Sequence, residues 1–367
     1  MIKTDCLVVG AGFSGATIAE RMAAELDLKV LVLEKRDHIG GNAFDRTNAN
    51  GVLIHPYGPH IFHTNKGRVW DYLSQFTEWR PYEHKVLAQI DGKLAPVPFN
   101  LNTLHTLFPS SQADRLEQLL IDQYGEDAQV PILKMRENAS DDLQELADYV
   151  YRKVFLGYTT KHWGLRPEEL SPLVTARVPV RISRDDRYFQ DTYQAMPSEG
   201  YTSLFQRMLD HPNITVHTEE DFFGLRERIS ARQVFYTGPI DAYYDYRFGK
   251  LPYRRLHFLH ENLSQPQYQP SGTVNYPNDH DYTRITEFKY LTGQQHPDTA
   301  IVREYPVAEG DPYYPVPQPE NESLFKRYDQ LAAKENNTTF VGRLANYRYY
   351  NMDQVVAAAL SHCGVPA

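Results

Sequence analysis

A glycine-rich turn between a short apolar strand and a helix constrains the fold of this chain more than any other feature. Residues 6–9 (Cys-Leu-Val-Val) predict a buried parallel strand, and the turn Gly10-Ala-Gly-Phe-Ser-Gly15 follows directly. Residues 16–26 then repeat apolar side chains at helical spacing, and residues 29–33 predict a second strand that ends at Glu34. This order of strand, glycine turn, helix, strand and acid predicts a βαβ unit that binds a dinucleotide.

Each glycine of the turn has its own expected role. Gly10 permits the tight turn, Gly12 lets the backbone approach a pyrophosphate, and Gly15 allows the helix to pack closely on the strand. The first N–H groups of the helix would donate to the phosphates, and Glu34 would accept from the adenosine ribose. Gly40-Gly41-Asn42 follows the second strand, as in many flavoproteins. An ordinary loop is the alternative interpretation of that glycine pair.

Composition excludes several classes of protein. The 367 residues include 47 acidic and 38 basic side chains, a net charge of −9, so the basic patch typical of a nucleic-acid-binding protein is not expected. An anionic ligand would instead need a few local arginines. No apolar run approaches the roughly 18–20 residues of a membrane span, and no signal peptide is recognised, which favours a cytoplasmic protein. Cys6 and Cys363 are expected to be reduced packing residues.

The fold class expected from these patterns is α/β, with a discontinuous Rossmann-like domain, an inserted helical domain and an antiparallel sheet domain. Residues 111–124 and the segment from Ser140 to Gly157 predict two helices, with Gly157 as the stop of the second. Residues 85–99, 178–183 and 254–305 predict the antiparallel sheet, and residues 234–238 and 339–342 predict later strands of the first domain. The expected boundaries are 1–84, 200–247 and 316–367 for the Rossmann-like domain, 103–177 for the helical domain with a mobile lid at 165–181, and 85–102, 178–199 and 248–315 for the sheet domain.

Three histidines near one another, His55, His60 and His63, superficially resemble a metal site. Proline and glycine interrupt the segment, and neither a carboxylate nor a cysteine completes a ligand set. We therefore predict no metal site.

The motifs along essentially the whole chain resemble those of the UDP-galactopyranose mutase family. Besides the opening turn, Glu34 and Gly40-Gly-Asn42, they comprise residues 57–63 (YGPHIFH), 157–164 (GYTTKHWG), 237–241 (TGPID), 248–254 (FGKLPYR), 312–315 (PYYP) and 342–353 (GRLANYRYYNMD). The stretches at 158–163 and 347–353 are the most specific, because many flavoproteins share the opening turn.

The resemblance implies an isomerase that interconverts UDP-galactopyranose and UDP-galactofuranose without net oxidation. FAD is the implied cofactor, active when reduced, and its N5 atom is implied to attack the anomeric carbon and expel UDP. The resemblance also implies a homo-oligomer (a homodimer) and a place in cell-wall polysaccharide biosynthesis.

The resemblance further implies roles for individual residues. Those implied for the cofactor are Gly10, Gly12, Phe13, Ser14, Gly15, Glu34, Lys35, Gly41, Asn42, His60, Arg343, Met352 and Asp353. Those implied for the substrate are His84, Tyr158, Trp163, Arg177, Tyr188, Arg284, Tyr314, Tyr349 and Asn351. The residues implied in catalysis are Arg177, Arg284, His60 and His63.

Two of these positions need comment. Asn351 stands where some family members carry an aspartate, which argues against an essential ionised carboxylate and leaves hydrogen bonding as its role. Asp353 can N-cap an apolar helix over residues 354–360 that Gly364 would stop, and the resemblance directs the start of this helix at the flavin.

Two other functions compete with the mutase. An FAD-dependent oxidase or dehydrogenase, such as an amine oxidase, shares the opening fold but would not require the pair Arg177 and Arg284. A non-catalytic nucleotide-sugar-binding protein would not require the flavin motifs.

Overall fold

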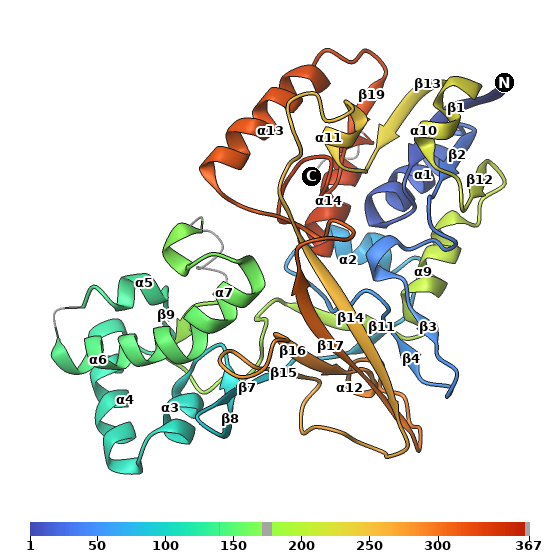
Figure 1. Ribbon diagram of the computed structural model, residues 1–367. Coiled ribbons are helices and arrows are strands. Elements are labelled where there is room, and N and C mark those ends of the chain that lie inside the picture. The colour runs from blue at the N-terminus through green and yellow to red at the C-terminus, as the bar shows by residue number, and fades with distance from the viewer. Residues whose placement is uncertain (139, 171–177, 364–367) are drawn as a thin grey trace.

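The computed structural model describes residues 1–138, 140–170 and 178–363. A five-stranded parallel sheet forms its first part, in the order β12-β2-β1-β13-β19. The strands span Ile214–His217, Val30–Leu33, Ile2–Val9, Ile229–Tyr236 and Thr338–Phe340, respectively. The predicted strands at 6–9, 29–33, 234–238 and 339–342 are therefore confirmed, and β1 lies at the centre of the sheet (Figure 1).

Both faces of this sheet are buried, which explains its continuous apolar strands. Val8 and Val32 belong to a core that includes helices α1 (Phe13–Leu26), α9 (Gly200–Leu209) and α14 (Met352–His362). Leu7 and Leu31 point the other way and join a second core with helix α13 (Pro319–Ala332). Helix α2 (Gly67–Leu73) adds to the first core, and the short helices α10 (Phe222–Leu225) and α11 (Ile240–Tyr243) add to the second.

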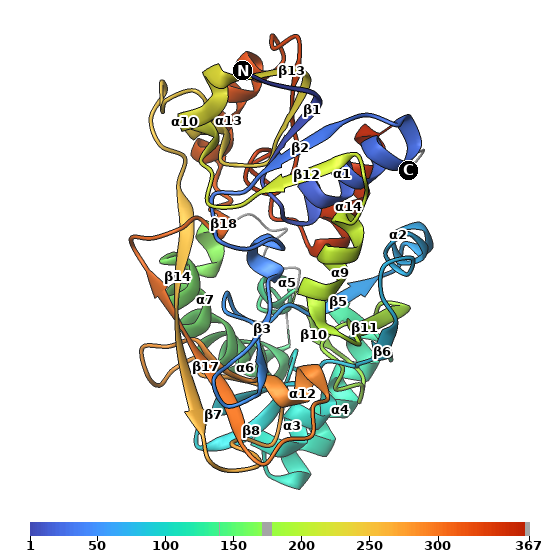
Figure 2. The same cartoon turned by 90° about the vertical axis from the view of Figure 1, so that its right-hand side faces the viewer.

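A seven-stranded sheet forms the second part and lies below the parallel sheet in Figures 1 and 2. Its order is β18-β14-β17-β16-β15-β7-β8. The strands span Tyr314–Pro315, Tyr253–Leu263, Thr299–Val307, Arg284–Glu287, Thr273–Asn275, Val86–Ile90 and Lys93–Val97, and helix α12 (Phe288–Thr292) follows β16. The predicted antiparallel pairing holds except between β15 and β7, which are parallel.

The register of the seven-stranded sheet gathers charged and aromatic residues on one face. Arg284 on β16 lies directly opposite Glu304 on β17, and Glu304 lies opposite Phe258 on β14. Arg254 is four residues before Phe258, so it shares this face, and it lies opposite Tyr314 on β18.

The third part is helical and appears in green at the left of Figure 1. It contains α3 (Leu101–Leu107), α4 (Ser110–Tyr124), α5 (Ile132–Met135), α6 (Asp141–Val150) and α7 (Gly157–Trp163). A π-helical segment, Tyr151–Leu156, joins α6 to α7. The helix predicted over 111–124 is confirmed, and Gly125 caps its C-terminal end.

The prediction that Gly157 stops the second helix is wrong. Gly157 has helical dihedral angles (φ −64°, ψ −45°), and the helix continues to Trp163, where Gly164 adopts the left-handed cap (φ +70°). A Cβ at Gly157 would lie 2.4 Å from the Pro277 carbonyl oxygen. Gly157 therefore serves a close approach to the loop after β15 rather than termination.

Two short strands pair differently from the prediction. The segment 178–183 contains β10 (Val180–Arg181), which pairs with β9 (Gln129–Val130) and not with the seven-stranded sheet. Strand β11 (Tyr193–Pro197) lies between β5 (Phe62–Thr64) and β6 (Trp79–Pro81) in a small antiparallel sheet. Strands of two to five residues carry too little pattern to specify a partner. The strands β3 (Arg46–Thr47) and β4 (Leu53–Ile54) form a further hairpin.

The start of α14 also differs from the prediction. Asn351, not Asp353, is the N-cap residue, and it forms a reciprocal capping box with Gln354. Asp353 lies in the first turn, where its charge still meets the positive end of the helix dipole. The predicted stop, Gly364, lies outside the described residues.

Candidate functional site

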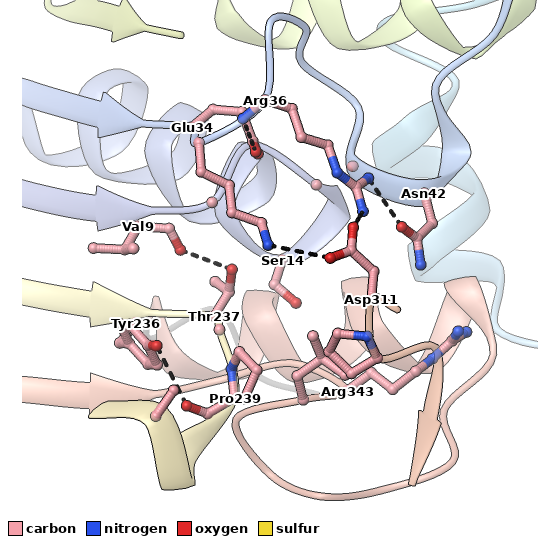
Figure 3. A pocket seen from close by; sticks show the side chains of 18 of the residues that line it. Val9, Ser14, Glu34, Arg36, Asn42, Tyr236, Thr237, Pro239, Asp311 and Arg343 are labelled. Carbon is pink, nitrogen blue, oxygen red and sulfur yellow. Dashed lines mark hydrogen bonds and ion pairs between the residues drawn. The ribbon is translucent and has the colours of Figure 1, made fainter. Parts of the chain in front are cut away.

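A pocket of about 670 Å³ lies at the carboxyl ends of the parallel strands (Figure 3). It is lined by the predicted cofactor residues Gly10, Gly12, Phe13, Ser14, Glu34, Lys35, Gly41, Asn42, His60, Arg343 and Met352. Tyr253, Arg255, Asp311 and Tyr313, from the predicted sheet domain, also line it. The carboxyl edge of a doubly wound parallel sheet is where such folds bind nucleotides.

The glycines of the first turn and of the pair Gly40-Gly41 form a cradle that side chains would fill. A Cβ at Gly10 would lie 2.3 Å from the hydroxyl oxygen of Thr237, and a Cβ at Gly41 would lie 3.0 Å from the Cα atom of Gly12. The N-cap of α1 is Gly12, which has no side chain to bond the free N–H groups of the first turn. Those N–H groups are available to phosphate oxygens, so the cradle fits a dinucleotide.

The buried carboxylate of Glu34 fixes the shape of this pocket. It accepts hydrogen bonds from the backbone N–H groups of Ala11 (2.9 Å) and Arg36 (3.0 Å). These bonds join the glycine turn to the end of β2. Glu34 thus lies where a ribose acceptor is expected, and it also holds the turn in place.

An ionic clasp that the sequence analysis missed crosses the pocket (Figure 3). The Arg36 guanidinium donates to the Asn42 side-chain oxygen (3.0 Å) and to Asp311 (3.2 Å), and Lys35 pairs with Asp311 at 3.6 Å. Arg36 also lies 4.2 Å from the ring centroid of Tyr57. Asp311 sits in a loop without periodicity, so no sequence signal could have indicated this contact.

A second group of predicted site residues forms an aromatic cluster between α7 and the seven-stranded sheet. Trp163 lies 5.6 Å from Tyr349 and 6.4 Å from Tyr314, measured between ring centroids, and Tyr314 lies 5.1 Å from Tyr349. His162, which the sequence analysis missed, stacks on Tyr158 at 5.8 Å. Tyr158 and His162 are four residues apart, so they share one face of α7.

Arg284 contributes a positive charge to this region. It donates to the buried carboxylate of Glu304 at 2.8 Å, directly across the strand pair. Burial alone would lower the pKa of Arg284, but Glu304 and Tyr158 raise it well above its ordinary value. The arginine therefore stays charged although it is largely enclosed.

His60 and Arg343 connect the pocket to the aromatic cluster. Both line the pocket, and the Arg343 guanidinium lies 5.1 Å from the ring centroid of Tyr314. Burial, with smaller contributions from His55, Arg343 and Arg284, lowers the pKa of His60 to about 3. A molecule in the cluster would therefore adjoin one in the pocket.

The other predicted histidines lie beside this region. His84 is buried, its ring lies 5.9 Å from that of Tyr188, and its Nδ1 hydrogen-bonds the Tyr82 hydroxyl at 3.0 Å. His63 on β5 hydrogen-bonds Asp191 at 2.8 Å and does not line the pocket.

Two further predicted site residues, Gly15 and Asp353, do not line the pocket, and a third lies outside the described residues. Gly15 faces the Gly10 carbonyl, so its role is packing. Asp353 accepts from the Thr64 hydroxyl at 3.1 Å and pairs with Lys66 at 3.7 Å. Arg177 lies outside the described residues.

Residues Thr237-Gly238-Pro239 belong to a motif of the resemblance, but the sequence analysis gave them no role in the site. This stretch follows β13, the strand beside β1, and lines the pocket. Because neighbouring parallel strands end at the same edge, its position follows from the strand prediction alone.

Three buried histidines predict how stability depends on pH. Burial lowers the pKa of His55 to about 4, and burial together with the charge of Arg284 lowers the pKa values of His84 and His162 to about 3. In the unfolded chain these groups titrate near 6.5, so the folded state binds fewer protons below that pH. We expect the free energy of unfolding to fall between pH 6.5 and 5, with a slope that approaches about 1.4 kcal/mol per pH unit for each histidine toward pH 5.

Denaturant titrations at several pH values measure this slope. The variant His162→Gln should have a shallower slope than the unmodified protein. A free energy of unfolding that is constant from pH 7 to 5 would contradict the interpretation, since most carboxylates titrate at lower pH.

Within the described parts of the chain, no three His, Cys, Asp or Glu side chains are grouped as metal ligands. Nor does any helix among those residues have the length and apolar character needed to cross a membrane.

The parallel sheet, the glycine cradle and the pocket at the carboxyl edge define a dinucleotide-binding protein with a flavoprotein-type Rossmann fold. A model of the NAD(P)-binding Rossmann-like domain matches residues 8–76, and a model of UDP-galactopyranose mutase matches residues 153–349. The chain belongs to the UDP-galactopyranose mutase family.

Relatives of known name agree with this assignment. The chain is 40% identical to a probable UDP-galactopyranose mutase of Klebsiella pneumoniae, covering 98% of this chain and 94% of the relative. It is 37% identical to the dTDP-fucopyranose mutase of Escherichia coli, covering 96% of each. It is 34% identical to the UDP-galactopyranose mutase of Mycoplasma pneumoniae, covering 98% of this chain and 95% of the relative.

Solved structures share the fold. The crystal structure of a reduced UDP-galactopyranose mutase matches with a TM-score of 0.72 at 16% identity, covering 99% of this chain and 96% of the other. A putative protoporphyrinogen oxidase from Exiguobacterium matches with a TM-score of 0.66 at 14% identity, covering 99% and 98%. The likeness to the oxidase is one of fold alone, so it does not favour the competing oxidase function.

Proposed function

We propose that this protein is a flavin-dependent mutase that interconverts the pyranose and furanose forms of a nucleotide-activated sugar, with UDP-galactose as its substrate. Arg284 carries the proposal: its enclosed guanidinium lies close to Tyr158 and Tyr314, in an aromatic cluster that adjoins a dinucleotide pocket. A protein with net charge −9 needs such a local cation to bind a diphosphate.

FAD is the proposed occupant of the pocket. The N-terminus of α1 would bind its pyrophosphate, Glu34 its ribose, and His60, Arg343 and Met352 would lie toward the flavin. Reduced FAD supplies a nucleophilic nitrogen, N5, for the anomeric carbon of the sugar. The residues that line the pocket hold the cofactor in position for this.

The protein's own side chains would act on the substrate in the cluster. Breaking the bond between the sugar and the diphosphate leaves negative charge on the diphosphate, and Arg284 would stabilise that charge. Trp163 and Tyr158 would pack against the sugar and the base, and stacking on a base contributes about 1–3 kcal/mol. Glu304 would hold the Arg284 guanidinium toward the substrate. Arg177 is proposed as a second diphosphate arginine.

The resemblance supports further proposals. We propose that the three expected domains divide the work: the Rossmann-like domain holds FAD, and the helical and sheet domains hold the sugar nucleotide. A cytoplasmic location, a homo-oligomer and a role in cell-wall polysaccharide biosynthesis are proposals of the same origin.

Turnover of candidate sugars tests the function. The FAD-loaded protein would be incubated with UDP-galactopyranose or with dTDP-fucopyranose, each with and without dithionite, and the products separated by chromatography. We expect UDP-galactofuranose from the reduced protein only, without stoichiometric consumption of reductant. An oxidised sugar formed with oxygen uptake, or equal rates for oxidised and reduced protein, would contradict the proposal. Turnover of dTDP-fucopyranose alone would correct the substrate.

A further inference from the structure

The helix that carries Tyr158, His162 and Trp163 must be held in place for the aromatic cluster to exist. Helix α7 packs against strand β17 of the seven-stranded sheet (Figures 1 and 2). Gly157 lets the first turn of α7 approach the loop after β15. Helix α7 has only seven residues and follows a π-helical segment. So short a helix depends on tertiary contacts for its position.

Two basic side chains attach the end of this helix to the loop after β15 and to strand β14. The Lys161 ammonium donates to the carbonyl oxygens of Tyr276 (2.6 Å) and Asp279 (2.7 Å). The Arg254 guanidinium, on β14, donates to the Lys161 carbonyl oxygen at 2.5 Å. That carbonyl belongs to the last turn of α7, where free carbonyl groups and the helix dipole favour a cation.

Arg254 occupies a position that links the helix to the rest of the cluster. It lies directly opposite Tyr314 in the strand pair β14–β18, on the sheet face that also carries Arg284 and Glu304. The Nε atom of Arg254 is buried and has no hydrogen-bond partner among the described residues. The bond to the Lys161 carbonyl oxygen therefore helps to fix the orientation of the guanidinium. Because Arg254 bonds to the carbonyl oxygen of Lys161, the residue directly before His162, its charge also lowers the pKa of His162.

We propose that Arg254 is a positioning residue: by binding the last turn of α7, it holds Trp163 and His162 against Tyr314 and so sets the affinity for the sugar nucleotide. This inference rests on the proposed function, because it takes the aromatic cluster as the substrate site. It concerns affinity, since Arg254 orients binding groups and does not line the dinucleotide pocket.

The variant Arg254→Met tests the proposal, with Arg303→Met as the matched control. Arg303 precedes Glu304 on β17, so it lies on the opposite face of the same sheet, where it pairs with Glu261. We expect Arg254→Met to raise KM for UDP-galactopyranose about tenfold and to weaken binding of UDP to the FAD-loaded protein to the same extent, with a smaller effect on kcat. Millimolar guanidinium should restore part of the UDP affinity of Arg254→Met. The UDP affinity of Arg254→Lys should lie between those of Arg254→Met and the unmodified protein.

The possible outcomes separate three cases. KM and UDP affinity within twofold of the Arg303→Met control would overturn the proposal. So would a variant that loses FAD and cooperative unfolding and is not rescued by guanidinium or by lysine, because Arg254 would then be structural only. If the unmodified protein binds UDP but turns over no sugar, the proposed function fails. The UDP titrations of the two variants would still decide the role of Arg254.

Discussion

Replacing Arg284 with alanine is expected to reduce kcat/KM for UDP-galactopyranose by about 30- to 1000-fold, which corresponds to about 2–4 kcal/mol of transition-state stabilisation. Arg284 is the charged group that acts on His60, His84, His162, Tyr158 and Tyr314 together. Its removal also leaves the buried carboxylate of Glu304 unpaired beside an anionic substrate. Steady-state kinetics of the reduced protein measure the loss.

The amount of bound FAD distinguishes this effect from misfolding. Arg284 lies on β16, which contributes no residue to the dinucleotide pocket lining, so Arg284→Ala should keep its flavin absorbance. Arg303→Ala, on the opposite face of the neighbouring strand, should retain near-normal kcat/KM. If Arg284→Ala also retains near-normal kcat/KM, the assignment of Arg284 to the diphosphate site is wrong.

Replacing Gly15 with alanine is expected to abolish tight FAD binding. A Cβ at this position would lie 1.8 Å from the Gly10 carbonyl oxygen and 3.0 Å from a methyl carbon of Val8. Both neighbours belong to the central strand or its turn, so α1 must move away from β1 and the cradle must change shape. Overpacking of this kind costs about 1–3 kcal/mol or more, and FAD affinity should fall at least about tenfold.

The matched control for this change is Gly224→Ala. A Cβ at Gly224 would have no neighbour within 4 Å, so FAD content and thermal stability should not change. Flavin absorbance after gel filtration and the melting temperature measure both properties. Full FAD content in Gly15→Ala would show that the turn tolerates a side chain, against the close packing described above.

The dinucleotide half of the molecule could be predicted from sequence because its signals are local. A β-branched run, three glycines and an acid specify β1, α1 and β2 within 34 residues, and a glycine follows two residues after each of the two later strands that were predicted, β13 and β19. Gly157 shows where local signals fail, because the sequence pattern predicts that the helix ends there and the helix continues to Trp163. The real reason for a glycine at this position is a carbonyl group of Pro277, far away in the chain.

The proposed substrate site depends on contacts that no local pattern encodes. Glu304 and Arg254 take part through strand register, and His162 through its place on a helix that the stop at Gly157 would have excluded. Asn351 and Asp353 are both good N-cap residues two positions apart, so sequence alone could not choose between them. Tertiary packing decides which residues these side chains contact and which residue caps the helix.

The order in which the pocket lining occurs along the chain has a consequence for biosynthesis. The lining begins at Val9, continues through residues 220–255 and ends at Val355 of a 367-residue chain. While the ribosome is still making the middle of the protein, β1 has β2 beside it but not β13, and Asp311 is not available to clasp Arg36. We therefore expect flavin to bind only after the residues through Val355 have been made, so that a shortage of flavin during growth would act on folded apoprotein rather than on nascent polypeptide.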